Sequence, residues 1–303
     1  MSLRLRLISF FLRVFAKTLL RRAKDPARNR DLLNLGAKFM FRAPPYALYL
    51  DEDLVPGLSS MWISARPGSR PPRAGKVMLY LHGGGFIAGS PQTHRAMLAR
   101  LAWMTGIEVC APDYRISPEH VFPDALNDTR AAHEALIAKG YAPENILLGG
   151  DSAGGAFVLA LLSELCAQDR RPAGVVCFTP VTDLTFSGDS MTENAQADHF
   201  LPPERKGDVQ HWYLRGADPH DPQASPLFAE FDAPPPVYFQ YSETEILRDD
   251  SVRMAAVLRA AGGEVVEDVW PDAPHVFPIF DGLVPEARIA LQRMADFMNR
   301  CFA

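Results

Sequence analysis

The sequence lacks the features that mark several large classes of protein. Its 303 residues contain no long uninterrupted apolar stretch, no internal repeat and no low-complexity tract, which argues against a membrane-spanning helix, a solenoid and a compositionally biased tail. An excess of basic residues is also missing, because 31 Lys and Arg stand against 36 Asp and Glu and give a net charge of −5. Such a chain has no general attraction for nucleic acid.

Cysteine is scarce as well. The four cysteines, at positions 110, 166, 177 and 301, show no paired spacing of the kind that binds metal. Cys110 and Cys177 lie in apolar runs, so we expect them to be buried thiols. Sparse, unpaired cysteines suit a reducing compartment, and we therefore expect a cytoplasmic protein.

The 48% of hydrophobic residues is ample for one large core. From residue 77 onward, apolar strand-like runs alternate with helical segments, a pattern that predicts an α/β fold. Its central sheet is expected to be mostly parallel and covered by helices on both faces. The predicted strands are 77–81, 107–111, 146–149, 175–178, 237–241 and 265–270, and the predicted helices are 95–104, 125–139, 153–168, 251–261 and 286–300.

One segment, residues 184–224, breaks this alternation. It is long, polar and helical only in part, which is typical of a lid or a binding loop. It contains Phe200, Leu201, Trp212 and Tyr213, which are candidates for lining an acyl pocket, with Phe200 and Trp212 preferred. Packing of the segment on the core explains them equally well.

Residues 1–24 form a predicted amphipathic helix. Charge interrupts the stretch too often for a membrane span, and no small-residue cleavage site follows it, as a signal peptide would require. We expect the helix to pack its apolar face on the protein itself, and we favour this over a basic helix that lies on an anionic membrane. The apolar stripe consists of Leu7, Ile8, Phe11, Leu12, Phe15 and Leu19, and the opposite basic face of Arg13, Lys17, Arg21 and Lys24.

The stretch around Ser152 organises the rest of the chain. Four apolar or small residues lead into Gly150-Asp151-Ser152-Ala153-Gly154, and a run of Ala, Leu and Val follows. This reads as a buried strand, a tight turn with the serine at its apex, and a helix, which is the context of a nucleophile elbow. Gly150 and Gly154 would allow strand and helix to pass closely.

A second glycine-rich stretch supports this reading. Residues 82–86, HGGGF, follow the predicted strand 77–81. Consecutive glycines free the backbone to aim several N–H groups at one point, which in acyl transfer is the oxyanion of the tetrahedral intermediate. Alone, the three glycines fit a flexible loop equally well, but the downstream elbow favours an oxyanion loop.

A serine nucleophile needs a histidine base and a carboxylate that orients it. The expected chain order is Ser, then acid, then His. His275 follows the last predicted strand, whereas His199, His211 and His220 fall in or beside the 184–224 segment. The acid is expected after strand 237–241. Asp249 and Asp250 directly precede a helix and fit the role of an N-cap or of a partner of the helix dipole, so spacing leaves Glu243 and Glu245 open.

The chain resembles the hormone-sensitive-lipase-like branch of the α/β-hydrolases, the bacterial family IV carboxylesterases. Four stretches carry the resemblance: HGGGF at 82–86, DYRISPEHVFPDAL at 113–126, GDSAGG at 150–155 and the loop around His275. The family's acid motif, D-P-L-x-D-E, aligns with residues 245–250. The resemblance therefore assigns the acid to Glu245, where the family usually has Asp, and implies a serine carboxylic-ester hydrolase with a Ser152, Glu245 and His275 triad.

The resemblance also implies the remaining architecture. It divides the chain into a catalytic domain, 46–303, and a helical cap made of residues 1–45 with the insertion 185–215. The oxyanion donors map to the backbone N–H groups of Gly83, Gly84 and Ala153, and Arg115 and Glu119 are expected to hold nearby loops. The family suggests short- to medium-chain acyl esters, no metal or organic cofactor, and a homodimer. Alternatives are a lactone hydrolase or deacetylase of the same family, or a membrane-surface lipase.

Overall fold

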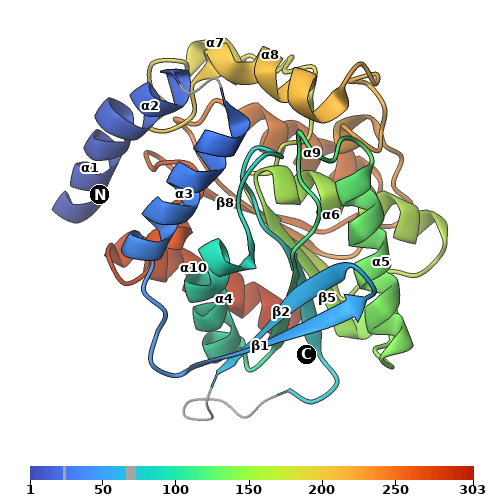
Figure 1. Ribbon diagram of the computed structural model, residues 1–303. Helices are drawn as coiled ribbons and strands as arrows, with labels where there is room; N and C mark the ends of the chain where they lie inside the picture. The colour runs from blue at the N-terminus through green and yellow to red at the C-terminus, as the bar shows by residue number, and fades with distance from the viewer. Residues whose placement is uncertain (23–24, 66–72) are drawn as a thin grey trace.

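The computed structural model describes residues 1–22, 25–65 and 73–303. Its centre is a sheet of eight strands in the order β1-β2-β4-β3-β5-β6-β7-β8, which all six predicted strands join (Figure 1). The predicted α/β fold is confirmed. The strands are β1 (Ala47–Val55), β2 (Leu58–Ala65), β3 (Val77–Leu81), β4 (Glu108–Pro112), β5 (Ile146–Asp151), β6 (Gly174–Phe178), β7 (Val237–Ser242) and β8 (Val265–Trp270).

The strands from β4 to β8 run parallel, and every residue of β3, β5, β6 and β7 is buried. Such continuous burial requires helices on both faces. One face is covered by α4 (Pro91–Thr105) and α10 (Pro285–Arg300), whose Leu101 and Leu291 pack with Met78. The other is covered by α5 (Asp124–Ala138), α6 (Ala153–Ala167) and α9 (Arg248–Ala260).

The hairpin of β1 and β2 was not predicted. Both of its pairings are antiparallel, and it extends one edge of the sheet. β1 carries the charged run Asp51-Glu52-Asp53 and buries no residue completely. An edge strand needs no continuous apolar run, so this hairpin has a weaker sequence signal than the central strands.

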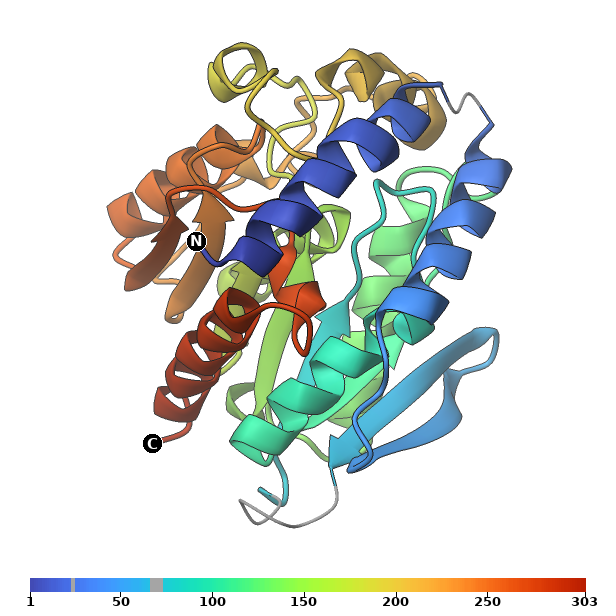
Figure 2. The same ribbon diagram turned by 90° about the vertical axis from the view of Figure 1, so that its left-hand side faces the viewer.

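The N-terminal helix is continuous from α1 (Leu3–Phe11) through a π-helical turn (Leu12–Ala16) to α2 (Lys17–Arg22). It lies at the same end of the molecule as α7 (Ser190–Glu193) and α8 (Lys206–Val209), as Figures 1 and 2 show. A second helix, α3 (Pro26–Met40), runs beside α4. No helix of residues 1–22, 25–65 and 73–303 is both long and apolar enough to cross a bilayer.

The predicted contact face of the N-terminal helix is only partly right. The helix packs on the protein through Ile8 and Leu12 of the expected apolar stripe, but Leu7, Phe11, Phe15 and Leu19 are exposed. The inner face also buries Leu5, and Lys17 of the expected basic face. Lys17 Nζ donates to the carbonyl oxygens of Ala195 and Asp198 at 2.9 and 2.8 Å, and these bonds offset the cost of burying a charged side chain. Lys24, the last residue of the predicted basic face, lies outside the described residues.

Candidate active site

Ser152 forms the turn between β5 and α6. Its backbone angles, φ 52° and ψ −121°, are rarely adopted by L residues. The turn leaves no room for side chains around it, because a Cβ on Gly154 would lie 2.0 Å from the Leu81 carbonyl oxygen. The Ser152 N–H donates to the Phe178 carbonyl, and its own carbonyl accepts from the Val181 N–H. This is the strand, turn and helix geometry of a nucleophile elbow, and Ser152 is only 8% exposed.

The carboxylate of Glu245 and the imidazole of His275 form a buried hydrogen-bonded pair. Their Oε2 and Nδ1 atoms lie 2.6 Å apart, and the two residues are 1% and 7% exposed. The other carboxylate oxygen, Oε1, accepts from the Ser242 N–H at 2.8 Å and from the Thr179 hydroxyl at 3.0 Å. With both oxygens engaged, the carboxylate is fixed in the plane of its hydrogen bonds and can orient the imidazole.

Burial opposes charging of His275, but the hydrogen bond and negative charge of Glu245 raise its pKa above the ordinary value of 6.5. The second ring nitrogen, Nε2, is buried and has no hydrogen-bond partner within the described chain. The loop that carries it is fixed by the Ala273 N–H, which donates to the Ser242 hydroxyl at 2.9 Å. His275 thus has one nitrogen held by Glu245 and one free for proton transfer.

Short connections join this pair to the elbow. Thr179 bonds Glu245 and directly follows Phe178, whose carbonyl holds the Ser152 backbone. Ser152, Glu245 and His275 follow the ends of β5, β7 and β8 and so lie at the carboxyl edge of the parallel sheet, where open α/β sheets place their ligands. No hydrogen bond joins the Ser152 hydroxyl to His275 among the described residues, and catalytic hydrogen bonds are often long before substrate binds.

The three glycines after His82 have different roles. Gly83 N–H donates to Asp151 Oδ1 at 2.9 Å, so it is not available to an oxyanion and its predicted role is corrected. Gly84 has φ 141°, and a Cβ there would lie 1.9 Å from the Ala88 carbonyl oxygen. In the part of the chain that the structure describes, no hydrogen bond engages the N–H groups of Gly84, Gly85 or Ala153.

Asp151 holds the loop of three glycines through the Gly83 N–H. Its carboxylate also accepts from the Tyr80 hydroxyl at 2.8 Å and lies 3.3 Å from His94 Nε2. Burial opposes ionisation of Asp151, but the charge of His94 outweighs it and holds the pKa of Asp151 below its ordinary range. The charge of Asp151 likewise raises the pKa of His94 despite burial. A buried ion pair of this kind fixes the loop's position relative to Ser152.

Residues 243–250, called the acid loop below, contain three carboxylates besides Glu245, and these have other surroundings. Glu243 is exposed. Asp250 is buried, accepts from the Thr182 and Asp183 N–H groups, and has its pKa raised to about 7 by burial. Because α9 begins at Arg248, Asp249 and Asp250 belong to its first turn and not to its N-cap. None of these three carboxylates bonds His275.

Asp249 ties α9 to the insertion, because its Oδ2 accepts from the Ser190 N–H at 2.8 Å. We expect Asp249→Asn to lower the free energy of unfolding by about 1 kcal/mol, since a hydrogen bond to a charged group and a favourable helix-dipole contact are weakened. The value of kcat should stay close to that of the wild type. Thermal denaturation and initial rates on the same preparation test both statements, and a loss of activity without a loss of stability would contradict them.

Sequence reasoning missed two polar residues of the insertion. The Asp198 side chain is buried and accepts from the N–H groups of Phe200, Leu201 and Ile246. Asn194 Nδ2 donates to the Glu243 and Glu245 carbonyls, both at 2.8 Å. The two side chains hold the insertion against the acid loop. The polar segment offers no spacing signal that would single them out.

The two preferred pocket residues lie in different surroundings. The Phe200 ring is nearly parallel to that of His275, with centroids 6.5 Å apart, so it lies beside the site. Trp212 is partly buried, and the Arg205 guanidinium lies over its ring at 5.2 Å. Among the described residues, neither a ring stack nor a hydrogen bond joins Trp212 to Ser152, Glu245 or His275.

The predicted loop-holding residues do contact loops around the site. Arg115 binds both carboxylate oxygens of Asp128 in the second turn of α5. Glu119 pairs with Arg30 of α3 at 2.7 Å, and Arg30 also donates to the Ile87 and Ser117 carbonyls. The helix α3 is thereby fastened to the segment that follows the three glycines.

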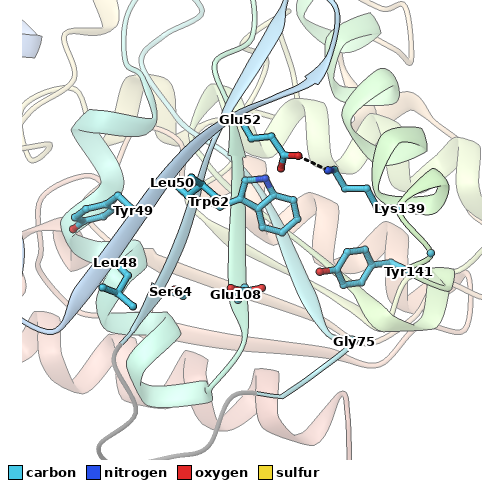
Figure 3. A pocket seen from close by; sticks show the side chains of 11 residues that line it. Leu48, Tyr49, Leu50, Glu52, Trp62, Ser64, Gly75, Glu108, Lys139 and Tyr141 are labelled. Atoms are coloured by element: carbon cyan, nitrogen blue, oxygen red, sulfur yellow. Dashed lines mark hydrogen bonds and ion pairs between the residues drawn. The ribbon is translucent and has the colours of Figure 1, made fainter.

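A separate hollow of about 680 Å³ lies beside the β1–β2 hairpin (Figure 3). Trp62 and Tyr141 form part of its wall, and Lys139 pairs with Glu52 at 2.6 Å along one side. It contains none of the predicted catalytic residues. Among the described residues, no group of three or more His, Cys, Asp or Glu side chains is arranged to hold a metal ion.

Comparisons with known proteins agree with this geometry. The family model described as the alpha/beta hydrolase fold matches residues 78–279. An esterase from Acinetobacter venetianus is 34% identical over 226 residues, which cover 74% of this chain and 75% of that protein. An acetyl-hydrolase from Streptomyces hygroscopicus is 36% identical over 232 residues, 76% of this chain and 78% of that protein.

A solved structure resembles the whole chain. The crystal structure of an esterase from the bacterial hormone-sensitive lipase family superposes with a TM-score of 0.92 at 36% identity. The match covers 100% of this chain and 99% of the other.

Proposed function

The chain belongs to the hormone-sensitive-lipase-like carboxylesterases of the alpha/beta hydrolase fold, and we propose that it cleaves short- to medium-chain acyl esters through Ser152, Glu245 and His275. Hydrolysis of carboxylic esters follows from the family. The observation that carries the choice of residues is the 2.6 Å bond between Glu245 and His275, at the sheet edge that also carries the Ser152 elbow. Glu245 is the only carboxylate of the acid loop that bonds His275.

In the proposed mechanism, His275 Nε2 takes the proton from the Ser152 hydroxyl as Oγ attacks the ester carbonyl. The imidazolium that forms is stabilised by Glu245. The N–H groups of Gly84, Gly85 and Ala153 are the proposed donors to the oxyanion, because Gly83 is engaged with Asp151. His275 then gives its proton to the leaving alcohol. Water attacks the acyl-enzyme with the same base, and the acid product leaves Ser152 with its proton restored.

We propose that residues 1–45 and the insertion 185–215 together form the cap over this site. Lys17 binds carbonyl groups of the insertion, and Arg13 donates to the Ala197 carbonyl at 2.6 Å and to His199 Nδ1 at 2.9 Å. His199 in turn binds Asp272, three residues before His275. These contacts connect the N-terminal helix, the insertion and the loop that carries His275, called the catalytic loop below, in one chain of hydrogen bonds.

Short and medium acyl chains are the expected substrates. Phe200 beside His275 and the nearly buried Ser152 favour an enclosed acyl site. Each buried CH₂ group adds about 0.8 kcal/mol of binding until such a site is full. We expect kcat/KM for p-nitrophenyl esters to rise from acetate to an early maximum and then to fall, and initial rates across the series from acetate to palmitate measure this. A rate that keeps rising to palmitate would favour a lipase.

A further inference from the structure

The N-terminal helix lies on the outside of the molecule (Figure 2), and several of its large apolar side chains are exposed to solvent. Leu3, Leu7 and Phe10 are 70, 59 and 63% exposed and Val14 is 42% exposed; these four side chains are called the apolar row below. Leu3, Leu7 and Phe10, at i, i+4 and i+7, follow one line along α1, and Val14 lies in the π-helical turn that comes next. Large exposed apolar side chains gathered on one helix are typical of a site of interaction.

Contacts on the inner face of the N-terminal helix fix its rotation about its own axis. Leu5 and Leu12 are buried against Ala273 and Phe277 of the catalytic loop. At the helix start, the Ser2 hydroxyl donates to Glu286 Oε2 at 2.8 Å, and Lys17 is held by two carbonyl groups of the insertion. A rotation that buried Leu7 and Phe10 would break these bonds. The apolar row therefore has no partner within the described part of this chain.

The charges beside the row are all basic. Residues 1–24 contain no Asp or Glu, and Arg4 and Arg6 are exposed next to Leu3 and Leu7. Two acidic groups of the neighbouring surface are already engaged, Glu204 with Arg21 and Glu286 with Ser2. The outward surface of the helix thus combines apolar side chains with unpaired positive charge, which is complementary to an anionic lipid surface.

We propose that this helix docks the enzyme on an anionic lipid bilayer. Its twenty residues from Leu3 to Arg22 extend about 30 Å at the rise of an α-helix. It lies in the plane of the interface, with Leu3, Leu7, Phe10 and Val14 at the acyl boundary and Arg4 and Arg6 among the headgroups. Because its inner face packs on the catalytic loop, docking brings the active-site end of the molecule to the lipid surface. The proposal is independent of which residues perform catalysis.

Vesicle flotation of the full chain tests it. We compare phosphatidylcholine vesicles with vesicles that also contain phosphatidylglycerol, and expect binding at least about 10-fold tighter to the anionic vesicles at low salt. The variant Leu7→Asp/Phe10→Asp should lose at least about 10-fold in binding. The matched control Val252→Asp/Ile289→Asp changes two similarly exposed apolar residues of α9 and α10 and should bind like the wild type. Arg4→Gln/Arg6→Gln should lose the preference for anionic lipid.

Hydrolysis of p-nitrophenyl butyrate in all variants reports whether they fold, and we expect it to stay within about twofold of wild type because every substituted side chain is exposed to solvent on the outer surface. Failure of the wild type to bind anionic vesicles overturns the proposal, as does unchanged binding by Leu7→Asp/Phe10→Asp. A second copy of this chain is the other partner that could cover the apolar row, and light scattering tests for it. If the wild type is a dimer that does not bind vesicles, and Leu7→Asp/Phe10→Asp is a monomer, the row is a contact between two copies. An inactive wild type that still binds vesicles would contradict only the proposed catalysis.

Discussion

Ser152→Ala is expected to abolish turnover of p-nitrophenyl butyrate, with a loss of at least about 10,000-fold in kcat. The substitution removes the atom that forms the acyl-enzyme and leaves the elbow backbone with the same Cβ. Because the backbone bonds of Ser152 with Phe178 and Val181 stay in place, the free energy of unfolding should change by less than about 0.5 kcal/mol. Initial rates and thermal denaturation on one preparation separate the two effects.

His275→Ala is the companion variant. It should lose activity to a similar extent, and the double variant should lose little more, because nucleophile and base act as a unit. Near wild-type rates in purified Ser152→Ala would end the serine hydrolase account, whichever way His275→Ala behaves.

Glu245→Gln is expected to lower kcat by at least about 100-fold. The amide keeps the size and the hydrogen-bonding capacity of the carboxylate but removes the charge that stabilises the imidazolium of His275. The loss should be visible in the pH profile too. Glu245 raises the pKa of His275 above 6.5, and the base is active only when neutral, so activity falls as pH drops through that raised pKa. Without the charge, this acid limb should shift to lower pH.

Two further variants make the result specific. Glu243→Gln should stay close to wild type, because that exposed side chain does not bond His275. Glu245→Asp should retain partial activity, since the charge remains but the shorter side chain reaches the imidazole less well. If Asp249→Asn were crippling and Glu245→Gln silent, the acid would be misassigned.

The central fold was predictable because the buried strands carry their signal locally. Continuous apolar runs such as 77–81 and 175–178 have few alternatives to a covered parallel sheet. The β1–β2 hairpin was missed because an edge strand with Asp51, Glu52 and Asp53 has no such run. The helix at residues 1–24 was predicted from its periodicity, but its inner face was predicted only in part. Which face packs inward depended on carbonyl groups of the insertion that reach Lys17 only in the folded chain.

The site was predictable to a similar extent. Ser152 has a sequence context, and chain order favoured His275. A run of three glycines does not tell which backbone N–H groups are free to bind an oxyanion. That depends on the Asp151 carboxylate, which accepts the Gly83 N–H in the folded chain. Asp198 and Asn194 gave no signal, because their partners are backbone groups of a loop that is distant in sequence.

The measurement that tests the central claim most directly is covalent trapping of the nucleophile. Diethyl p-nitrophenyl phosphate reacts with an activated serine: an Oγ–phosphorus bond forms, p-nitrophenolate leaves, and the hydroxyl proton passes to the histidine base. The account predicts one diethyl phosphate group per chain by intact mass, on the peptide that contains Ser152, with activity lost in proportion to labelling. Ser152→Ala should remain unlabelled, and Glu245→Gln should label more slowly. A label on another residue, or full activity in the fully labelled enzyme, would contradict it.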